Sequence, residues 1–75
     1  MNIDEFVKNF ADVFDDTDAS EINADTVFQD LDEWSSLINM SVIAMVKTKY
    51  NKSISGKEIR SCETVMDLKN LVEAK

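Results

Sequence analysis

The chain of 75 residues carries a formal net charge of −7, and 44% of its residues are hydrophobic. A chain of this size has room for one hydrophobic core, and the absence of proline together with a single glycine predicts one mostly helical domain over residues 1–75. Because there is no histidine and only one cysteine, the composition excludes Ser-His and Cys-His catalytic pairs, imidazole metal ligands and internal disulfides, so we expect neither an enzyme nor a metal protein.

The first predicted element is a helix over about residues 3–15. Apolar side chains recur there at intervals of three and four residues, which places them on one helical face. The members of this face are Ile3, Phe6, Val7, Phe10, Ala11, Val13 and Phe14. We expect Phe6 and Phe10 to belong to the hydrophobic core.

A long loop is predicted next, from the acidic run at residues 15–18 to about Ser35. The segment is rich in Asp, Ser, Asn and Thr and has neither a helical nor an alternating period. Loops of about twenty residues are uncommon in compact domains and usually have a function, and this one resembles an Ω-type loop. Its apolar residues predict that it packs on the helices, with Trp34 as an anchor; they are Ile22, Val27, Phe28, Leu31 and Trp34.

The second helix is predicted from Ser35 and Ser36 to Tyr50, with serine at its N-cap and lysines in its last turn. One arc of this helix is assigned to the core and consists of Ile38, Val42, Met45, Val46 and Tyr50. A second apolar stripe lies on the opposite arc and consists of Leu37, Met40 and Ala44. Either the helix is buried nearly all round, or this stripe is an exposed face on which a partner docks.

Two further helices are predicted in the last third of the chain. The first is a short helical segment from Gly56 to Ser61. Thr64 and Asp67 then form a variant of the capping box, which opens a final amphipathic helix that reaches about Glu73, with Leu68 in the core. The predicted fold class is therefore all-α: a small four-helix bundle of three main helices plus a short third helix, with a long loop between the first two.

Charge is divided unevenly along the chain. Residues 1–33 hold 11 acidic side chains and one basic one, whereas residues 34–75 hold four acidic and seven basic ones. The negative total disfavours binding to nucleic acid, and the acidic half is expected to meet basic partners. The N-terminus shows no secretory signal and the longest uncharged run, 13 residues, is shorter than a membrane span, so we expect a cytoplasmic protein with no membrane span.

Two serines, Ser35 and Ser36, stand at the head of the second helix, after the acidic residues Asp30, Asp32 and Glu33. A serine before a helix is most simply an N-cap. A helix N-terminus also accommodates phosphate well, because its free N–H groups and the positive end of the helix dipole face the anion. The residues alone therefore favour the N-cap, with a phosphate site as the alternative.

The chain resembles acyl carrier and peptidyl carrier proteins in the segment over residues 26–37, which reads TVFQDLDEWSSL. In that family a Phe-x-x-Leu stretch leads to Asp-Ser-Leu, and the likeness continues through the second helix, through residues 50–54 and through residues 64–68. The resemblance implies that 4′-phosphopantetheine, taken from coenzyme A, is esterified to Ser36. Its distal thiol would carry acyl or aminoacyl intermediates as thioesters, while partner enzymes supply the acids and bases.

The resemblance also implies the partners of such a carrier. They are a phosphopantetheinyl transferase and the enzymes that load, condense or transfer the acyl or aminoacyl group in fatty-acid-like or specialised biosynthesis. The carrier itself is expected to be a monomer. We expect its partners to dock on Asp32, Glu33, Leu37, Met40 and Ala44.

Two departures from the family pattern matter: the first bears on recognition by the transferase and leaves Ser35 as an alternative to Ser36, and the second bears on docking to fatty-acid enzymes. Ser35 stands where the family usually has Asp. The second helix carries Asn39, Ser41, Lys47 and Lys49 where fatty-acid carriers have several Glu residues. The segments over residues 34–37 and 56–60 resemble stand-alone carriers, so we expect a carrier for a specialised pathway that makes a polysaccharide, a modified lipid or an aminoacyl intermediate. The alternative is an unmodified small helical module that binds other proteins.

Two other features have simpler explanations than a functional site. Asp16 and Asp18 imitate the start of a calcium-binding loop, but Glu21 stands where that loop requires Gly and Val27 where it requires a bidentate Glu. We expect no metal site there. Cys62 is expected to be a small packing residue between helices, with an exposed redox thiol as the alternative.

Overall fold

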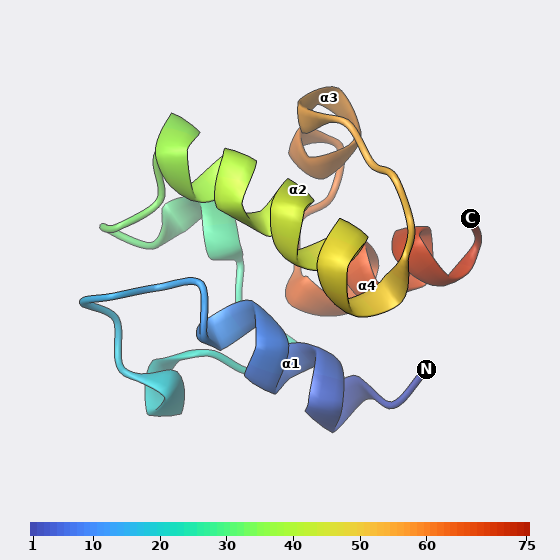
Figure 1. Ribbon diagram of the computed structural model, residues 1–75. Coiled ribbons are helices and arrows are strands. Elements are labelled where there is room, and N and C mark those ends of the chain that lie inside the picture. The colour runs from blue at the N-terminus through green and yellow to red at the C-terminus, as the bar shows by residue number, and fades with distance from the viewer.

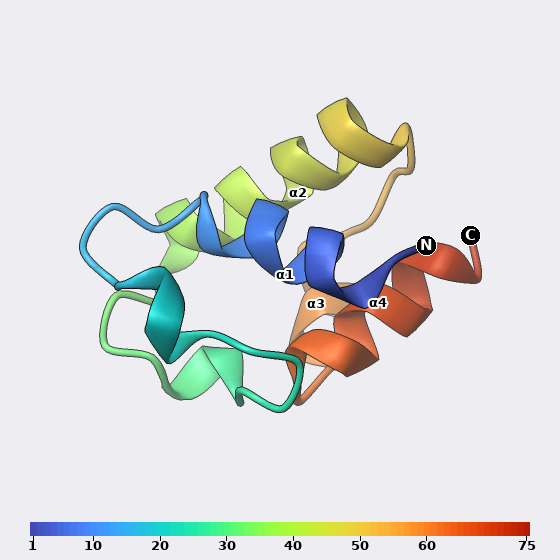
Figure 2. The ribbon, with the colours of Figure 1, turned by 90° about the horizontal axis from the view of Figure 1, so that it is seen from below.

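The computed structural model describes all 75 residues and is an all-α bundle of four helices. The helices are α1 (Ile3–Ala11), α2 (Ser36–Tyr50), α3 (Gly56–Arg60) and α4 (Val65–Glu73). α1 and α2 run in opposite directions, and the long connection between them lies at one end of the bundle, with both chain termini at the other (Figures 1 and 2). The predicted fold class is confirmed, including the short third helix and the long loop between the first two helices.

The interior of the bundle is one cluster of 16 buried residues, all of them apolar. It includes seven of the eight residues predicted for the core: Phe6, Phe10, Val42, Val46 and Leu68 have no exposed surface, and Ile38 and Met45 are buried as well. Tyr50, predicted on the core arc of α2, packs against the cluster half-buried, and its hydroxyl accepts a hydrogen bond of 2.9 Å from the Asn9 amide. In so small a domain this single core supplies most of the favourable free energy of folding.

Phe10 lies at the centre of an aromatic group that joins α1 to the long loop. Its ring centroid is 5.4 Å from that of Phe14, 5.5 Å from that of Phe28 and 6.5 Å from that of Trp34. Trp34 also meets Phe28 edge-on at 5.0 Å, a favourable arrangement for aromatic rings. The prediction that Trp34 anchors the loop on the core is therefore confirmed, and this contact fixes the chain just before α2 begins.

α1 is shorter than the apolar pattern predicted, because it ends at Ala11 and not near residue 15. After Asp12 the backbone tightens: the N–H of Val13 donates to the carbonyl of Phe10 at 3.1 Å, and the N–H of Phe14 to that of Ala11 at 3.0 Å. These bonds are of the 3₁₀ type, which commonly ends an α-helix. The apolar period continues beyond the helix because Phe14 still reaches the core.

The long loop contains two 3₁₀ turns, Ala19–Glu21 and Phe28–Asp30, which the sequence pattern did not predict. Between them, the backbone is tied to the start of α4 by hydrogen bonds from Val65 N–H to Thr26 carbonyl (3.1 Å) and from Met66 N–H to Ala24 carbonyl (2.9 Å). The expectation that Val27 packs on the bundle is wrong. Its backbone pairs with Thr64 in an isolated bridge, which leaves the Val27 side chain 38% exposed.

The last two helices begin at capping boxes. Ser55 pairs in this way with Glu58 at the start of α3, and Thr64 pairs with Asp67 at the start of α4, the latter as predicted. Each box satisfies backbone N–H groups that the first helical turn would otherwise leave unpaired. The two boxes therefore fix where α3 and α4 begin.

Candidate functional site

The two serines at the head of α2 have different roles in the structure. Ser35 is the N-cap, in extended conformation, and its Oγ accepts a hydrogen bond of 3.3 Å from the N–H of Ile38. Ser36 is the first residue of the helix, is exposed, and keeps its hydroxyl clear of the cap. The predicted N-cap role belongs to Ser35, so Ser36 can carry a substituent without loss of the cap.

Ser36 borders a shallow pocket of about 230 Å³ between the end of the long loop, α2 and α3. The pocket is lined by Gln29, Trp34, Ser35, Ser36, Asn39 and Arg60. Only Trp34 among these is hydrophobic, so the space beside Ser36 is polar. Gln29 holds one wall in place, because its Nε2 donates a hydrogen bond of 2.9 Å to the carbonyl of Cys62 beyond α3.

The second apolar stripe of α2 lies at the surface. The exposed fraction is 71% for Leu37 and 66% for Met40, and Ala44 is exposed as well. Of the two possibilities that the sequence left open, burial all round is therefore wrong and exposure is right. The hydroxyl of Ser41, the residue after Met40, donates a hydrogen bond of 3.0 Å to the Leu37 carbonyl. This polar group is therefore paired within α2.

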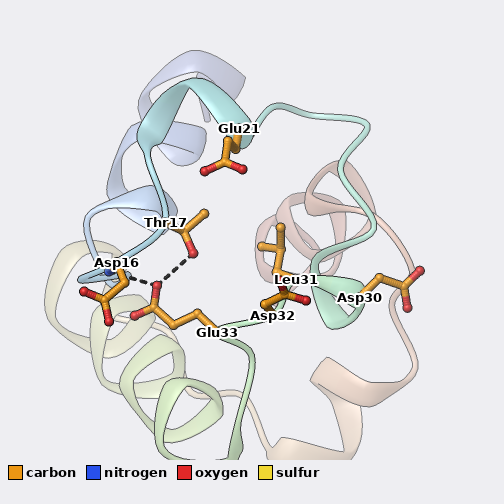
Figure 3. A pocket seen from close by; sticks show the side chains of 7 residues that line it. All are labelled: Asp16, Thr17, Glu21, Asp30, Leu31, Asp32 and Glu33. Atoms are coloured by element: carbon orange, nitrogen blue, oxygen red, sulfur yellow. Dashed lines mark hydrogen bonds between the residues drawn. The ribbon is translucent and has the colours of Figure 1, made fainter.

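The approach to Ser36 from the long loop is acidic. Five of the seven residues that line a hollow of about 490 Å³ in the loop carry carboxylates, and the full set is Asp16, Thr17, Glu21, Asp30, Leu31, Asp32 and Glu33. Figure 3 shows that these side chains come from both arms of the loop, with that of Asp30 directed away from the others. The structure thus places the acidic residues that precede Ser36 in the sequence next to others from the distant start of the loop.

Glu33 has a second role, because its carboxylate closes the loop. It accepts hydrogen bonds from the N–H of Asp15 (2.9 Å), the N–H of Asp16 (3.0 Å) and the hydroxyl of Thr17 (2.8 Å), and Figure 3 shows the last two. The Thr17 hydroxyl, with help from the backbone N–H groups, holds the pKa of Glu33 below its usual range despite some desolvation. Asp32, its neighbour, is exposed and has no such partner in Figure 3.

Cys62 is buried, as predicted for a packing residue. Burial raises the pKa of its thiol, and its Sγ lies 3.5 Å from the carbonyl of Glu58, to which it donates. A thiol of this kind is a poor nucleophile, because the reactive form is the thiolate.

No group of three or more His, Cys, Asp or Glu side chains is arranged to hold a metal ion, and no helix is long and apolar enough to traverse a bilayer.

Three residues of the Ser36 pocket were not singled out as site residues from the sequence: Gln29, Asn39 and Arg60. Asn39 follows Ser36 by three positions on α2. The sequence could have indicated its place in the pocket only through this spacing, which puts both residues on one helical face. Arg60 comes from α3, and only the packing of α3 against α2 brings it to the serine. The loop-closing role of Glu33 was missed for the same reason, since its partners at residues 15–17 are distant in the sequence.

Comparison of the chain with protein-family models, with curated proteins and with solved structures finds no match. The site is therefore interpreted from its own residues and from the resemblance of the segment around Ser36. The relevant features are an exposed serine at a helix N-terminus, a polar pocket beside it and an exposed apolar stripe below it.

Proposed function

We propose that the protein is a carrier whose Ser36 is esterified by 4′-phosphopantetheine, and that it presents acyl or aminoacyl intermediates to partner enzymes in the cytoplasm. When attached, the group supplies a thiol that holds the intermediate as a thioester. The chain has no histidine for acid–base catalysis at neutral pH, which suits a protein whose partners supply the chemistry.

The observation that carries the proposal is that the two serines have different structural roles. Because Ser35 caps α2, the Ser36 hydroxyl is free at the exposed first turn. In the attachment step this oxygen attacks the β-phosphorus of coenzyme A, a bond from Ser36 Oγ to phosphorus forms, and the phosphoanhydride bond to adenosine 3′,5′-bisphosphate breaks. The serine proton passes to a base of the transferase. The N-terminus of α2 accommodates the resulting anionic phosphodiester.

The surface around Ser36 supports docking by other proteins. The Leu37, Met40 and Ala44 stripe offers exposed apolar surface, and Asp32 offers an exposed carboxylate above it. Partners are expected to combine an apolar contact with a basic rim near Ser36. Lys47 and Lys49, exposed in the last turns of α2, favour partners that are acidic or neutral at that end. This charge pattern supports a specialised pathway over ordinary fatty-acid synthesis.

The test is loading by coenzyme A and a promiscuous phosphopantetheinyl transferase, followed by intact mass measurement of the wild type, Ser36→Ala and Ser35→Ala. The wild type should gain one phosphopantetheine and Ser36→Ala none. Ser36→Ala should keep its melting temperature, because the cap is elsewhere. Ser35→Ala should still load but lose about 0.5–2 kcal/mol of stability, because it removes the N-cap hydrogen bond.

The two serine variants are matched controls, since they are adjacent and each removes one hydroxyl. Modification that persists in Ser36→Ala and disappears in Ser35→Ala would overturn the assignment to Ser36. A wild type that gains no mass under conditions that load a known carrier would instead favour the unmodified protein-binding module.

A further inference from the structure

The polar pocket beside Ser36 contains the one buried side-chain oxygen or nitrogen atom that lacks a hydrogen-bond partner. This atom is Oδ1 of Asn39. An amide oxygen is an acceptor and does not pair with an anion, so the part of this side chain that can bind an anion in the pocket is its Nδ2 donor group. Asn39 lines the pocket together with Ser36, and the two residues are three positions apart on the same face of α2.

Arg60 is the only cation that lines this pocket. It is also the only arginine of the chain, and none of the three ion pairs in the structure involves it. Its side chain is exposed and reaches the pocket from the last residue of α3. A guanidinium group without a carboxylate partner, in a chain with a net charge of −7, is available to pair with an anion.

Gly56 lies beside the side-chain nitrogens of both Asn39 and Arg60. A Cβ atom at Gly56 would lie 3.0 Å from Nδ2 of Asn39 and 3.4 Å from Nη1 of Arg60. Because both nitrogens are that close to one point, they are at most 6.4 Å apart, the sum of the two distances. Charge-assisted hydrogen bonds to an anionic oxygen are about 2.7–2.9 Å long, so two donors at this separation can bracket one phosphate group. The missing side chain at Gly56 leaves room for both.

We propose that Arg60 and the Asn39 amide bind the phosphodiester anion of the group on Ser36, and so direct the start of the arm toward α3. The inference rests on the proposed function, because the anion is supplied by modification of Ser36. Ser36, Asn39 and Arg60 line the same pocket, so the phosphate is held by its covalent bond at high effective concentration beside both donors. The free N–H groups at the start of α2 add to the attraction for the anion.

The test compares the apo and phosphopantetheinylated forms of the full chain, with mass measurement to confirm loading. Because Arg60 is the only arginine, its Nε–H gives a single amide-region NMR signal that needs no assignment. This signal should move on loading in the wild type. The indole N–H signal of Trp34, the only tryptophan and also a pocket residue, should move with it.

Thermal unfolding supplies a second measurement. At low salt the loaded wild type should melt about 2–5 °C above its apo form, since the new contact exists only after loading. Arg60→Gln should abolish this difference without changing the apo melting temperature, and Arg60→Lys should restore part of it. Lys57→Gln, the matched control, neutralises another exposed cation of α3 that does not line the pocket and should keep the difference.

The outcomes separate the two proposals. If the wild type gains no phosphopantetheine mass, both are overturned. If it loads at Ser36 but the Arg60 signal stays in place, and Arg60→Gln and Lys57→Gln respond alike to loading, the carrier function stands and the phosphate contact is wrong. A melting difference that shrinks at high salt in both the wild type and Lys57→Gln would support the contact, because screening weakens an exposed ion pair.

Discussion

The two faces of α2 carry similar apolar side chains in opposite environments. Ile38 is 7% exposed and lies in the core, whereas the adjacent and isomeric Leu37 is 71% exposed. The same contrast separates the fully buried Val42 from Met40, which is 66% exposed. Packing accounts for the apolar residues of the first face. Nothing in the fold requires those of the second face, and this difference is the basis of the proposed docking of partners there.

A similar contrast divides the two acidic residues predicted for docking. The Glu33 carboxylate is committed to the loop through three hydrogen bonds, whereas Asp32 is exposed and uncommitted. From the sequence alone, nothing distinguished Glu33 from Asp32 as a docking residue. The structure indicates that Asp32 is the freer of the two to meet a partner, and that Glu33 first of all shapes the loop that leads to Ser36.

The largest expected effect tests the two faces of α2 by stability. Ile38→Ala should lower the free energy of unfolding by about 2–5 kcal/mol, because it removes buried methyl groups and leaves a cavity. Leu37→Ala, its matched control, should change stability by no more than about 0.5 kcal/mol. Urea unfolding followed by Trp34 fluorescence measures both. Equal losses would mean that Leu37 packs in solution, and the docking face would lose its structural basis.

The second prediction tests the exposed face by kinetics. Leu37→Ala and Met40→Ala should each reduce kcat/KM for loading by a phosphopantetheinyl transferase about 5- to 30-fold, since a central apolar contact in an interface is worth about 1–2 kcal/mol. The apo proteins should unfold as the wild type does. Asn70→Ala, which removes an exposed side chain on α4 away from Ser36, serves as the control and should load at the wild-type rate. Normal loading of both stripe variants would contradict docking on this face.

The third prediction concerns the two basic charges in the last turn of α2. Changing both Lys47 and Lys49 to Glu should improve turnover of the acylated carrier by a fatty-acid ketosynthase, because the substitution removes like charge opposite basic patches. A gain of about fivefold is expected at low salt, with less at high salt where the interaction is screened. A wild type that already serves this enzyme well, with no gain in the variant, would remove the main argument for a specialised pathway.

The helices and the core of this protein could be predicted because they follow from residue spacing. The apolar period located α2 and its buried face, and the Thr64–Asp67 capping box located the start of α4. The end of α1 was misplaced because Phe14 continues the period through a 3₁₀ turn. The two turns of the long loop were missed because each is only three residues long and creates no period.

The candidate site was only partly predictable. The position of Ser36 followed from its family-like segment, and the exposure of the Leu37 stripe was one of two possibilities that helical geometry allowed. The pocket could not be predicted, because Gln29, Asn39 and Arg60 come from three elements whose contacts depend on tertiary packing. The role of Glu33 required the loop to be folded, since its hydrogen-bond donors precede it by a whole segment of chain.

The smallest expected effect sharpens the contrast between Glu33 and Asp32. Glu33→Gln keeps the shape of the side chain but removes its charge and one acceptor, so the N–H groups of Asp15 and Asp16 should exchange with solvent faster. Asp32→Asn should leave that exchange unchanged.

Lowering the pH should speed the exchange of these two N–H groups in the same way as Glu33→Gln. The folded state holds the pKa of Glu33 below its unfolded value of about 4.3. The stabilisation of the loop by the ionised carboxylate is therefore complete above that value and is lost as the pH falls through the folded pKa. Hydrogen exchange followed by NMR in neutral and acidic solution measures both effects. Equal protection of the two amides in wild type and Glu33→Gln would mean that the carboxylate does not close the loop, and Glu33 would return to the docking set as a free charge.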